Sequence, residues 1–183
     1  AWQIRAMRLF VALALPAEVA QSMFLLQGGV PGARWQTREQ LHLTLRFIGD
    51  VDGRDAANID DVLSSIEAAR FTLALKGVGE FGGRNPRALW AGVNNPMPVI
   101  HLQKKIERAL QRIGQPPEER KFMPHVTLAR LRAAPTPKVL EYLSEHGLFV
   151  SPQFWVDAFH LYSSHLTPNG SVYVVERSYA LAG

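Results

Sequence analysis

The chain has no cysteine among its 183 residues. This absence excludes disulfide bonds, thiolate nucleophiles and zinc sites with cysteine ligands. It is compatible with a cytoplasmic protein, which we expect here. No apolar stretch approaches the roughly 18 residues of a membrane-spanning helix, so we expect no membrane association. Low-complexity segments and long linkers are also missing, and the length fits one domain over residues 1–183.

Charge of either sign is limited. The chain has 16 Asp and Glu against 20 Lys and Arg, which gives a formal net charge of +4 and a sequence pI of about 9.7. A basic excess of this size suits a polyanionic partner without demonstrating one. With 47% hydrophobic and 20% charged residues, the composition is that of a globular chain able to bury a sizeable core.

Hydrophobic periodicity predicts helices and strands without strict alternation, which is typical of an α+β fold. An apolar run at residues 9–15 loosely imitates a secretory signal, but it is short and Pro16 after it suits the start of a helix. We therefore interpret it as part of a buried strand. Helices are expected at residues 17–27, 54–69, 98–113 and 137–146, and strands at residues 7–15, 41–47, 71–78, 88–93, 126–131, 156–163 and 171–179.

The motif His-x-Thr-Leu occurs twice, at residues 42–45 and 125–128, and its two histidines are 83 residues apart. Because side chains alternate along a strand, His42 and Thr44 share one face, and so do His125 and Thr127. The apolar residues between them point the other way, into a core. A single such histidine is more often structural than catalytic, but two matched copies in opposite halves favour a shared cleft.

Two imidazoles and two hydroxyls around one small group suit the hydrolysis of a phosphate diester. A neutral histidine takes a proton from water, and a protonated one gives a proton to the leaving alkoxide. Histidine titrates near neutrality, so both forms are available. The hydroxyls can bond the non-bridging oxygens as charge develops on them. We expect no cofactor and no metal, and a cyclic phosphate fits especially well because its 2′-hydroxyl has already made the first displacement.

These motifs resemble those of the two-histidine (2H) phosphoesterase superfamily, and in particular its bacterial and archaeal RNA 2′,3′-cyclic phosphodiesterases, also called 2′-5′ RNA ligases. The resemblance covers nearly the whole chain. It is carried by residues 8–16, by Trp35 with residues 41–49, by residues 120–130 and by residues 161–170. The segment at residues 120–130 is the most specific of these, whereas a bare His-x-Thr is common.

The resemblance implies a bilobal, pseudo-two-fold α+β fold, with two antiparallel-rich sheets flanking a central cleft and the helices outside. It implies that His42 is the general acid that protonates the departing O3′, and that His125 is the general base that activates water, leaving a 2′-phosphate. Thr44, Thr127 and Arg130 would hold the phosphate. The partners would be RNA with 2′,3′-cyclic phosphate ends or small cyclic nucleotides, with ATP-independent 2′-5′ ligation as a related reverse reaction, and we expect a monomer.

Strand alternation treats two arginines differently from the resemblance. It places Arg130 on the face opposite the second motif's histidine, so Arg130 reaches the cleft only if the strand twists, bulges or ends near Ala129. It places Arg46 on the face of the first motif's histidine, where a cleft contact and a solvated position at the rim are both open. Phe122 is another candidate for a base or rim contact, because an aromatic ring can stack on a base. Core packing is expected for Trp35.

Two other functions compete with the hydrolase. A binding module would hold a nucleotide or an RNA end without turnover, but both histidines and both threonines are present, which argues against lost activity. A metal-dependent hydrolase fares worse, because neither motif has a second histidine or a carboxylate at ligand spacing. Asp50 and Asp52 follow the first motif but lie in a turn-like stretch.

Overall fold

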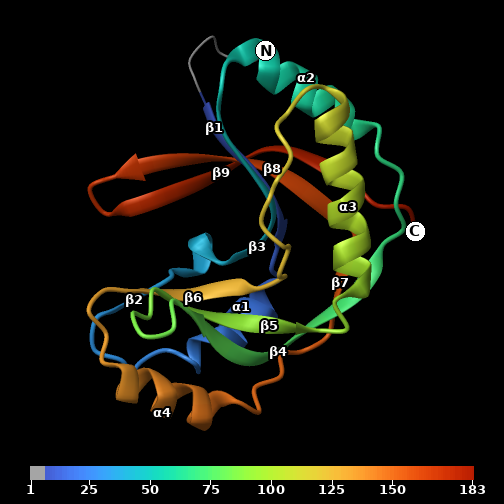
Figure 1. Cartoon of the computed structure of the whole chain (residues 1–183). Coiled ribbons are helices and arrows are strands. Elements are labelled where there is room, and N and C mark those ends of the chain that lie inside the picture. Colours follow the sequence, from blue (N-terminus) through green and yellow to red (C-terminus); the bar gives the residue numbers. More distant parts are fainter. Residues whose placement is uncertain (1–6) are drawn as a thin grey trace.

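The computed structural model describes residues 7–183, so residues 1–6 of the expected domain lie outside the described residues (Figure 1). The strands are β1 (Met7–Ala14), β2 (Ala33–Trp35), β3 (His42–Val51), β4 (Phe71–Phe81), β5 (Ala88–Asn94), β6 (Val126–Leu131), β7 (Phe154–Val156), β8 (Ala158–Thr167) and β9 (Gly170–Ala180). The helices are α1 (Ala17–Phe24), α2 (Gly53–Ser64), α3 (Met97–Arg112) and α4 (Thr136–His146), with a 3₁₀ turn at Arg38–Gln40.

The elements expected from periodicity are all present, with ends displaced by a few residues. The run at residues 9–13 is almost wholly buried within β1, as expected for a strand inside a sheet. The pattern missed β2 and β7, because each spans only three residues and is too short for an alternation to be recognised. Over residues 7–183, no helix combines the length and the apolar character needed to cross a membrane.

All strand pairings are antiparallel, and the strand order is β7-β4-β5-β6-β3-β1-β8-β9, with β2 added beside β6. The two halves of this order meet where β3 pairs with β6, and only Leu43 and Val126 are in register there. The two sheets expected from the sequence are therefore halves of one curled sheet with a narrow junction. The α+β class and its antiparallel sheets are confirmed.

Helices cover the outside of this curled sheet (Figure 1). Helices α2 and α3 lie against the half that contains β1, β3, β8 and β9, and Tyr179 Oη of β9 donates to Asp60 Oδ1 of α2 at 2.7 Å. Helices α1 and α4 lie at the other half, where Tyr142 Oη of α4 donates to the Leu26 carbonyl at 2.7 Å. The strands that carry the two motifs, β3 and β6, are neighbours at the junction of these two halves.

Candidate active site

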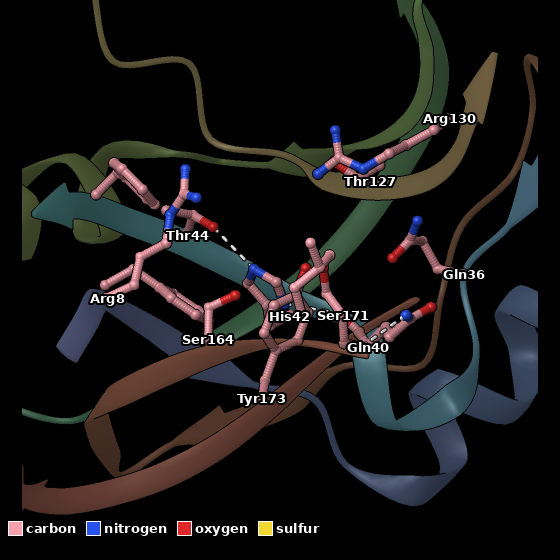
Figure 2. Close-up of a pocket in the computed structure, with 13 residues that line it drawn as sticks. Arg8, Gln36, Gln40, His42, Thr44, Thr127, Arg130, Ser164, Ser171 and Tyr173 are labelled. Atoms are coloured by element: carbon pink, nitrogen blue, oxygen red, sulfur yellow. Dashed lines mark hydrogen bonds between the residues drawn. The ribbon is translucent and has the colours of Figure 1, made fainter. Parts of the chain in front are cut away.

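The two motif strands lie next to each other in the sheet and open onto two adjoining cavities. His42 lines the first, of about 300 Å³, and His125 lines the second, of about 580 Å³. Thr44, Phe47 and Arg130 line both cavities, so the two form one continuous cleft. Figure 2 shows the first cavity, with Thr127 and Arg130 from β6 across from the side chains of β3.

Both histidines are held by the same backbone contact. His42 Nδ1 donates to the carbonyl of Gln40 at 2.7 Å, and His125 Nδ1 donates to the carbonyl of Met123 at 2.6 Å. Because a carbonyl oxygen can only accept, Nδ1 carries the hydrogen in each ring. Each Nε2 is therefore the nitrogen left for proton exchange with a bound group.

The surroundings of His42 disfavour its charged form. Its Nε2 lies 2.9 Å from Thr44 Oγ1, and its ring packs against Phe10 at 4.9 Å and edge-on against Tyr173 at 5.0 Å between centroids. Burial is the main cause that lowers the pKa of His42 to about 4, and the positive charge of Arg130 lowers it further. In the free protein at neutral pH, His42 is thus neutral and its Nε2 accepts the hydrogen bond from Thr44.

His125 lies in a more open setting at the second cavity. Its ring meets Phe81 edge-on at 5.0 Å and Trp90 at 6.2 Å between centroids. Trp90 lies across Gly79 of the neighbouring strand, where a Cβ would come within 2.1 Å of the indole ring. Glycine at that position therefore leaves room for the Trp90 ring, which is tilted by 57° to the ring of His125.

A β-bulge follows each motif and decides where the next side chains point. On β6, Trp90 of the neighbouring strand pairs with Thr127 and Leu89 pairs with Ala129, so Leu128 is an extra residue. An extra residue reverses the alternation beyond it. Arg130 consequently returns to the face of His125 and Thr127, and it lines both cavities. From the sequence, Arg130 could reach the cleft only if its strand twisted, bulged or ended near Ala129. The bulge is present.

Comparison with known proteins gives the family of this chain. A family model described as the 2′-5′ RNA ligase superfamily matches residues 17–168. The chain belongs to this superfamily. A relative from Aeropyrum pernix, named RNA 2′,3′-cyclic phosphodiesterase, is 38% identical over 138 residues, which are 74% of this chain and 78% of the relative. A relative of the same name from Thermotoga maritima is 34% identical over 177 residues, 92% of each chain.

Solved structures of the superfamily share the fold. Escherichia coli LigT complexed with 3′-AMP has a TM-score of 0.81 and 26% identity, and the match covers 98% of this chain and 100% of LigT. A Thermus thermophilus protein has a TM-score of 0.80 and 27% identity over 97% of this chain and 99% of its own. The family and the fold class predicted from the paired motifs are thereby confirmed.

Arg46 does not lie at the rim of the cleft. Strand alternation predicted that it would share the face of His42, and the structure corrects this prediction. Val11 of β1 pairs with Arg46 and Ala12 pairs with Thr44, so Leu45 is an extra residue and the alternation reverses here too. Arg46 is 6% exposed and turns to the helix side of the sheet. The cleft face is taken by Phe47 instead.

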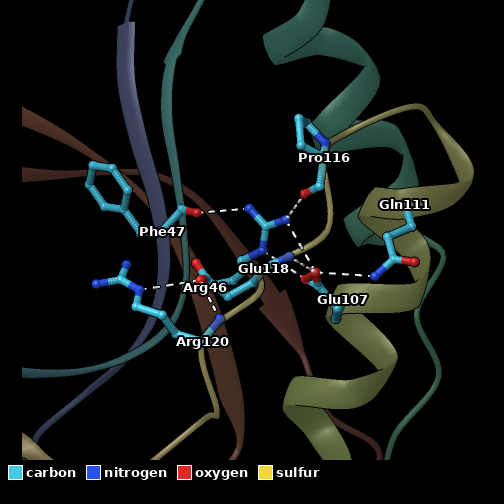
Figure 3. Close-up of polar contacts among 7 residues, drawn as sticks. All are labelled: Arg46, Phe47, Glu107, Gln111, Pro116, Glu118 and Arg120. Atoms are coloured by element: carbon cyan, nitrogen blue, oxygen red, sulfur yellow. Dashed lines mark hydrogen bonds and ion pairs between the residues drawn. The ribbon is translucent and has the colours of Figure 1, made fainter.

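The buried Arg46 binds α3 and the loop that leads to the second motif (Figure 3). Its Nε donates to Glu107 Oε2 of α3 at 2.7 Å, and a further guanidinium nitrogen donates to the carbonyl of Pro116. Glu107 Oε1 also accepts from the backbone N–H of Glu118 at 2.8 Å. Burial raises the pKa of Glu107, but its hydrogen bonds to Arg46 and to the backbone outweigh burial and lower it overall.

The two aromatic candidates, Phe122 and Trp35, lie in different settings. Phe122 lines the second cavity and also packs against the core. Trp35 packs against Tyr142 with ring centroids 5.7 Å apart, in agreement with the expected core role.

Sequence reasoning missed part of the first cavity's wall. These residues are Arg8, Phe10, Gln36, Gln40, Phe47, Ser164, Leu166, Ser171 and Tyr173. Those of β8 and β9 arrive because β8 pairs with β1, and because Gln40 Nε2 donates to the carbonyl of Ser171 at 3.0 Å. Gln40 was the detectable one, since it lies only two residues before His42.

Proposed function

We propose that this chain hydrolyses the 2′,3′-cyclic phosphate ends of RNA to 2′-phosphates without a metal ion or cofactor. One observation carries the proposal: two histidines, each held through Nδ1 by a backbone carbonyl, line one continuous cleft together with Arg130. That arrangement supplies two proton-transfer groups and a cation for the phosphate. The relatives named RNA 2′,3′-cyclic phosphodiesterase support the same reaction.

In the proposed reaction, His125 is the general base and His42 is the general acid. His125 Nε2 takes a proton from water as the water oxygen bonds to phosphorus. The bond from phosphorus to O3′ breaks, and O3′ receives a proton from His42 Nε2. The threonine hydroxyls of the two motifs and the guanidinium of Arg130 hold the non-bridging oxygens as they gain charge. The product carries a phosphate on O2′ and a free 3′-hydroxyl.

This assignment requires that His42 gains a proton when the substrate binds. With a pKa of about 4, His42 is neutral in the free protein at neutral pH and has no proton on Nε2, yet a general acid must hold one there. A bound phosphodiester brings a negative charge beside Arg130 and offsets the effect of that cation. We therefore expect the pKa of His42 to rise on binding, with uptake of a proton from solvent.

Two further readings use the same cleft. The hydroxyl of a second RNA can take the place of water, which gives ATP-independent 2′-5′ ligation by the same two histidines. A binding module that holds a cyclic nucleotide or RNA end without turnover is the alternative function. A monomeric state and a cytoplasmic location stay predictions from the sequence.

The test of the reaction uses the purified protein in excess EDTA. It is incubated with each 2′,3′-cyclic nucleotide and with a short RNA that ends in a cyclic phosphate, and the products are separated by chromatography. We expect a 2′-phosphate product that is lost in both His42→Ala and His125→Ala. Binding of the same compounds without product would favour the binding module, and activity only with added divalent cations would contradict metal independence.

A substrate analogue separates the acid from the base. Sulfur in place of the leaving 3′ oxygen departs without a proton, so it removes the need for a general acid. On this analogue, His42→Ala should recover much of the wild-type rate while His125→Ala stays defective. Recovery of His125→Ala instead would reverse the two roles.

A further inference from the structure

A glutamine amide without a partner among the described residues lies in the wall of the larger cavity. Gln103 is on α3 within the buried face of that helix, and it is only 7% exposed. Its side chain makes no hydrogen bond to any residue in the described part of the chain. Among the described residues, Trp90 Nε1 is the only fully buried side-chain nitrogen or oxygen without a partner, so the amide atoms of Gln103 are not sealed from solvent. Gln103 lines the cavity that also holds His125, so a ligand in that cavity can supply the missing partner.

Large apolar side chains stand among the polar and charged residues that line the cavity around this amide. Phe47, which is 38% exposed, lines the cavity together with Phe81, Phe122 and Met123. The volume of about 580 Å³ falls in the range typical of small-molecule sites. Aromatic side chains and an amide in one wall match a planar ring that carries hydrogen-bonding groups on its edge.

The cavity is continuous with the place proposed for the phosphate. Thr44 and Arg130 line it as well as the smaller cavity that contains His42. A nucleotide with its cyclic phosphate between the two histidines can therefore extend its base into the larger cavity. The shared wall links the phosphate and the ring to one ligand.

We propose that the larger cavity binds the nucleobase of the nucleotide that carries the cyclic phosphate, and that Gln103 reads the edge of that base. The proposal rests on the proposed function for the position of the phosphate. A glutamine amide presents a donor and an acceptor side by side, and it pairs in this way with adenine above all. Gln103 would thus be a specificity-determining residue, with the aromatic side chains supplying stacking that tolerates any base.

The test compares kcat/KM for the four 2′,3′-cyclic mononucleotides in wild type, Gln103→Leu and Gln103→Glu. A good bidentate pair to a base contributes about 1–3 kcal/mol, so Gln103→Leu should lower kcat/KM for the preferred base about 5- to 150-fold and flatten the differences among bases. Glutamate only accepts, so Gln103→Glu should shift the preference toward cytosine and its amino group. Gln21→Leu, the same change at an exposed position of α1, should alter nothing.

Two readouts guard against a structural explanation. Inhibition by inorganic phosphate should stay unchanged in Gln103→Leu, because the phosphate site is intact. Its thermal midpoint should stay close to that of wild type, because the Gln103 amide makes no hydrogen bond to the described protein that leucine would remove. An equal loss for all four bases, or a clear loss of thermal stability, would overturn the proposal and give Gln103 a structural role.

The outcome is distinguishable from failure of the proposed function. Unchanged ratios among the four substrates in Gln103→Leu would overturn the base site while the phosphodiesterase reaction stands. If wild type turns over no substrate, the affinities of the four nucleoside 2′-monophosphates are titrated instead. Affinities that differ among bases in wild type and become equal in Gln103→Leu support the base site even then, and identical patterns in both proteins reject it.

Discussion

The strands that carry His42 and His125 share one backbone plan but place the two rings in different surroundings. In both, Nδ1 is held by the carbonyl two residues earlier, and a bulge follows the motif. His42 is packed between aromatic rings and bonded to Thr44, which lowers its pKa to about 4, whereas His125 lies open to the larger cavity. Duplicated geometry thus supplies two proton-transfer groups, and different burial makes them chemically unequal.

The same comparison continues one step past each bulge. Phe47 occupies in the first motif the position that Arg130 occupies in the second, and both face the cleft. The core-facing positions just before them differ as well. Arg46 is paired with Glu107, whereas Ala129 is packed in the core. Arg130 therefore supplies a cation at the proposed phosphate site, and Phe47 supplies an aromatic face beside it.

The largest effect is expected from removing either histidine. His42→Ala and His125→Ala should each lower kcat about 10²- to 10⁴-fold on cyclic phosphate substrates, because each removes one proton-transfer group. The double variant should be little worse than the poorer single variant, since the two groups act as one unit. Steady-state kinetics of the three proteins checks this. Independent, multiplicative losses would contradict a paired mechanism.

The next prediction tests the core-facing residue Arg46. Arg46→Met leaves the Glu107 carboxylate without its buried partner, so the free energy of unfolding should fall by about 3–4 kcal/mol. Urea denaturation followed by tryptophan fluorescence measures this. The double variant Arg46→Met with Glu107→Leu should regain much of the loss, because no unpaired charge remains. If the single variant is as stable as wild type, the ion pair between Arg46 and Glu107 contributes nothing to the free energy of unfolding.

The sequence was informative wherever alternation continued unbroken. The face shared by His42 and Thr44 follows from spacing alone, because one intervening residue fixes the side of the strand. The bulges were not predictable in the same way, since they depend on the register of a neighbouring strand. A signal was available on β6, where Leu128 and Ala129 are two consecutive core residues ahead of Arg130.

On β3 the corresponding signal is concealed by charge. The second core-facing residue there is Arg46. Its burial depends on the ion pair with Glu107, which is 61 residues further along the chain. Ser171 and Tyr173 escaped prediction for a related reason. Their hairpin reaches the cleft through pairing of β8 with β1 and through the bond from Gln40, both of which are long-range contacts.

Arg130 gives the next effect in size. Arg130→Gln should lower kcat/KM about 10- to 100-fold through loss of a charged hydrogen bond to the phosphate. It should also raise the pKa of His42 in the free protein, because the positive charge of Arg130 helps to lower it. NMR titration of the His42 ring measures that change. Phe47→Leu at the matching position is the control and should leave the pKa of His42 in place.

Stability against pH offers an independent check of the same coupling. The pKa of His42 is about 4 in the folded protein and about 6.5 when unfolded, so between these values the unfolded state binds more protons. Stability from this group is therefore full above about pH 6.5 and falls as the pH drops toward 4. Arg130→Gln should make this fall smaller relative to wild type, and His42→Gln should remove the contribution.

The smallest expected effect separates the two threonines. Thr44 is bonded to His42 Nε2 at 2.9 Å, whereas in the described structure Thr127 has no such bond to His125. Thr44→Val and Thr127→Val should each lower kcat about 2- to 10-fold through a lost hydrogen bond to the phosphate. Only Thr44→Val should also alter the titration of the neighbouring histidine ring, because only that hydroxyl contacts an imidazole. Equal changes in the titration of both histidines would show that the environments of the two motifs are more alike than their packing indicates.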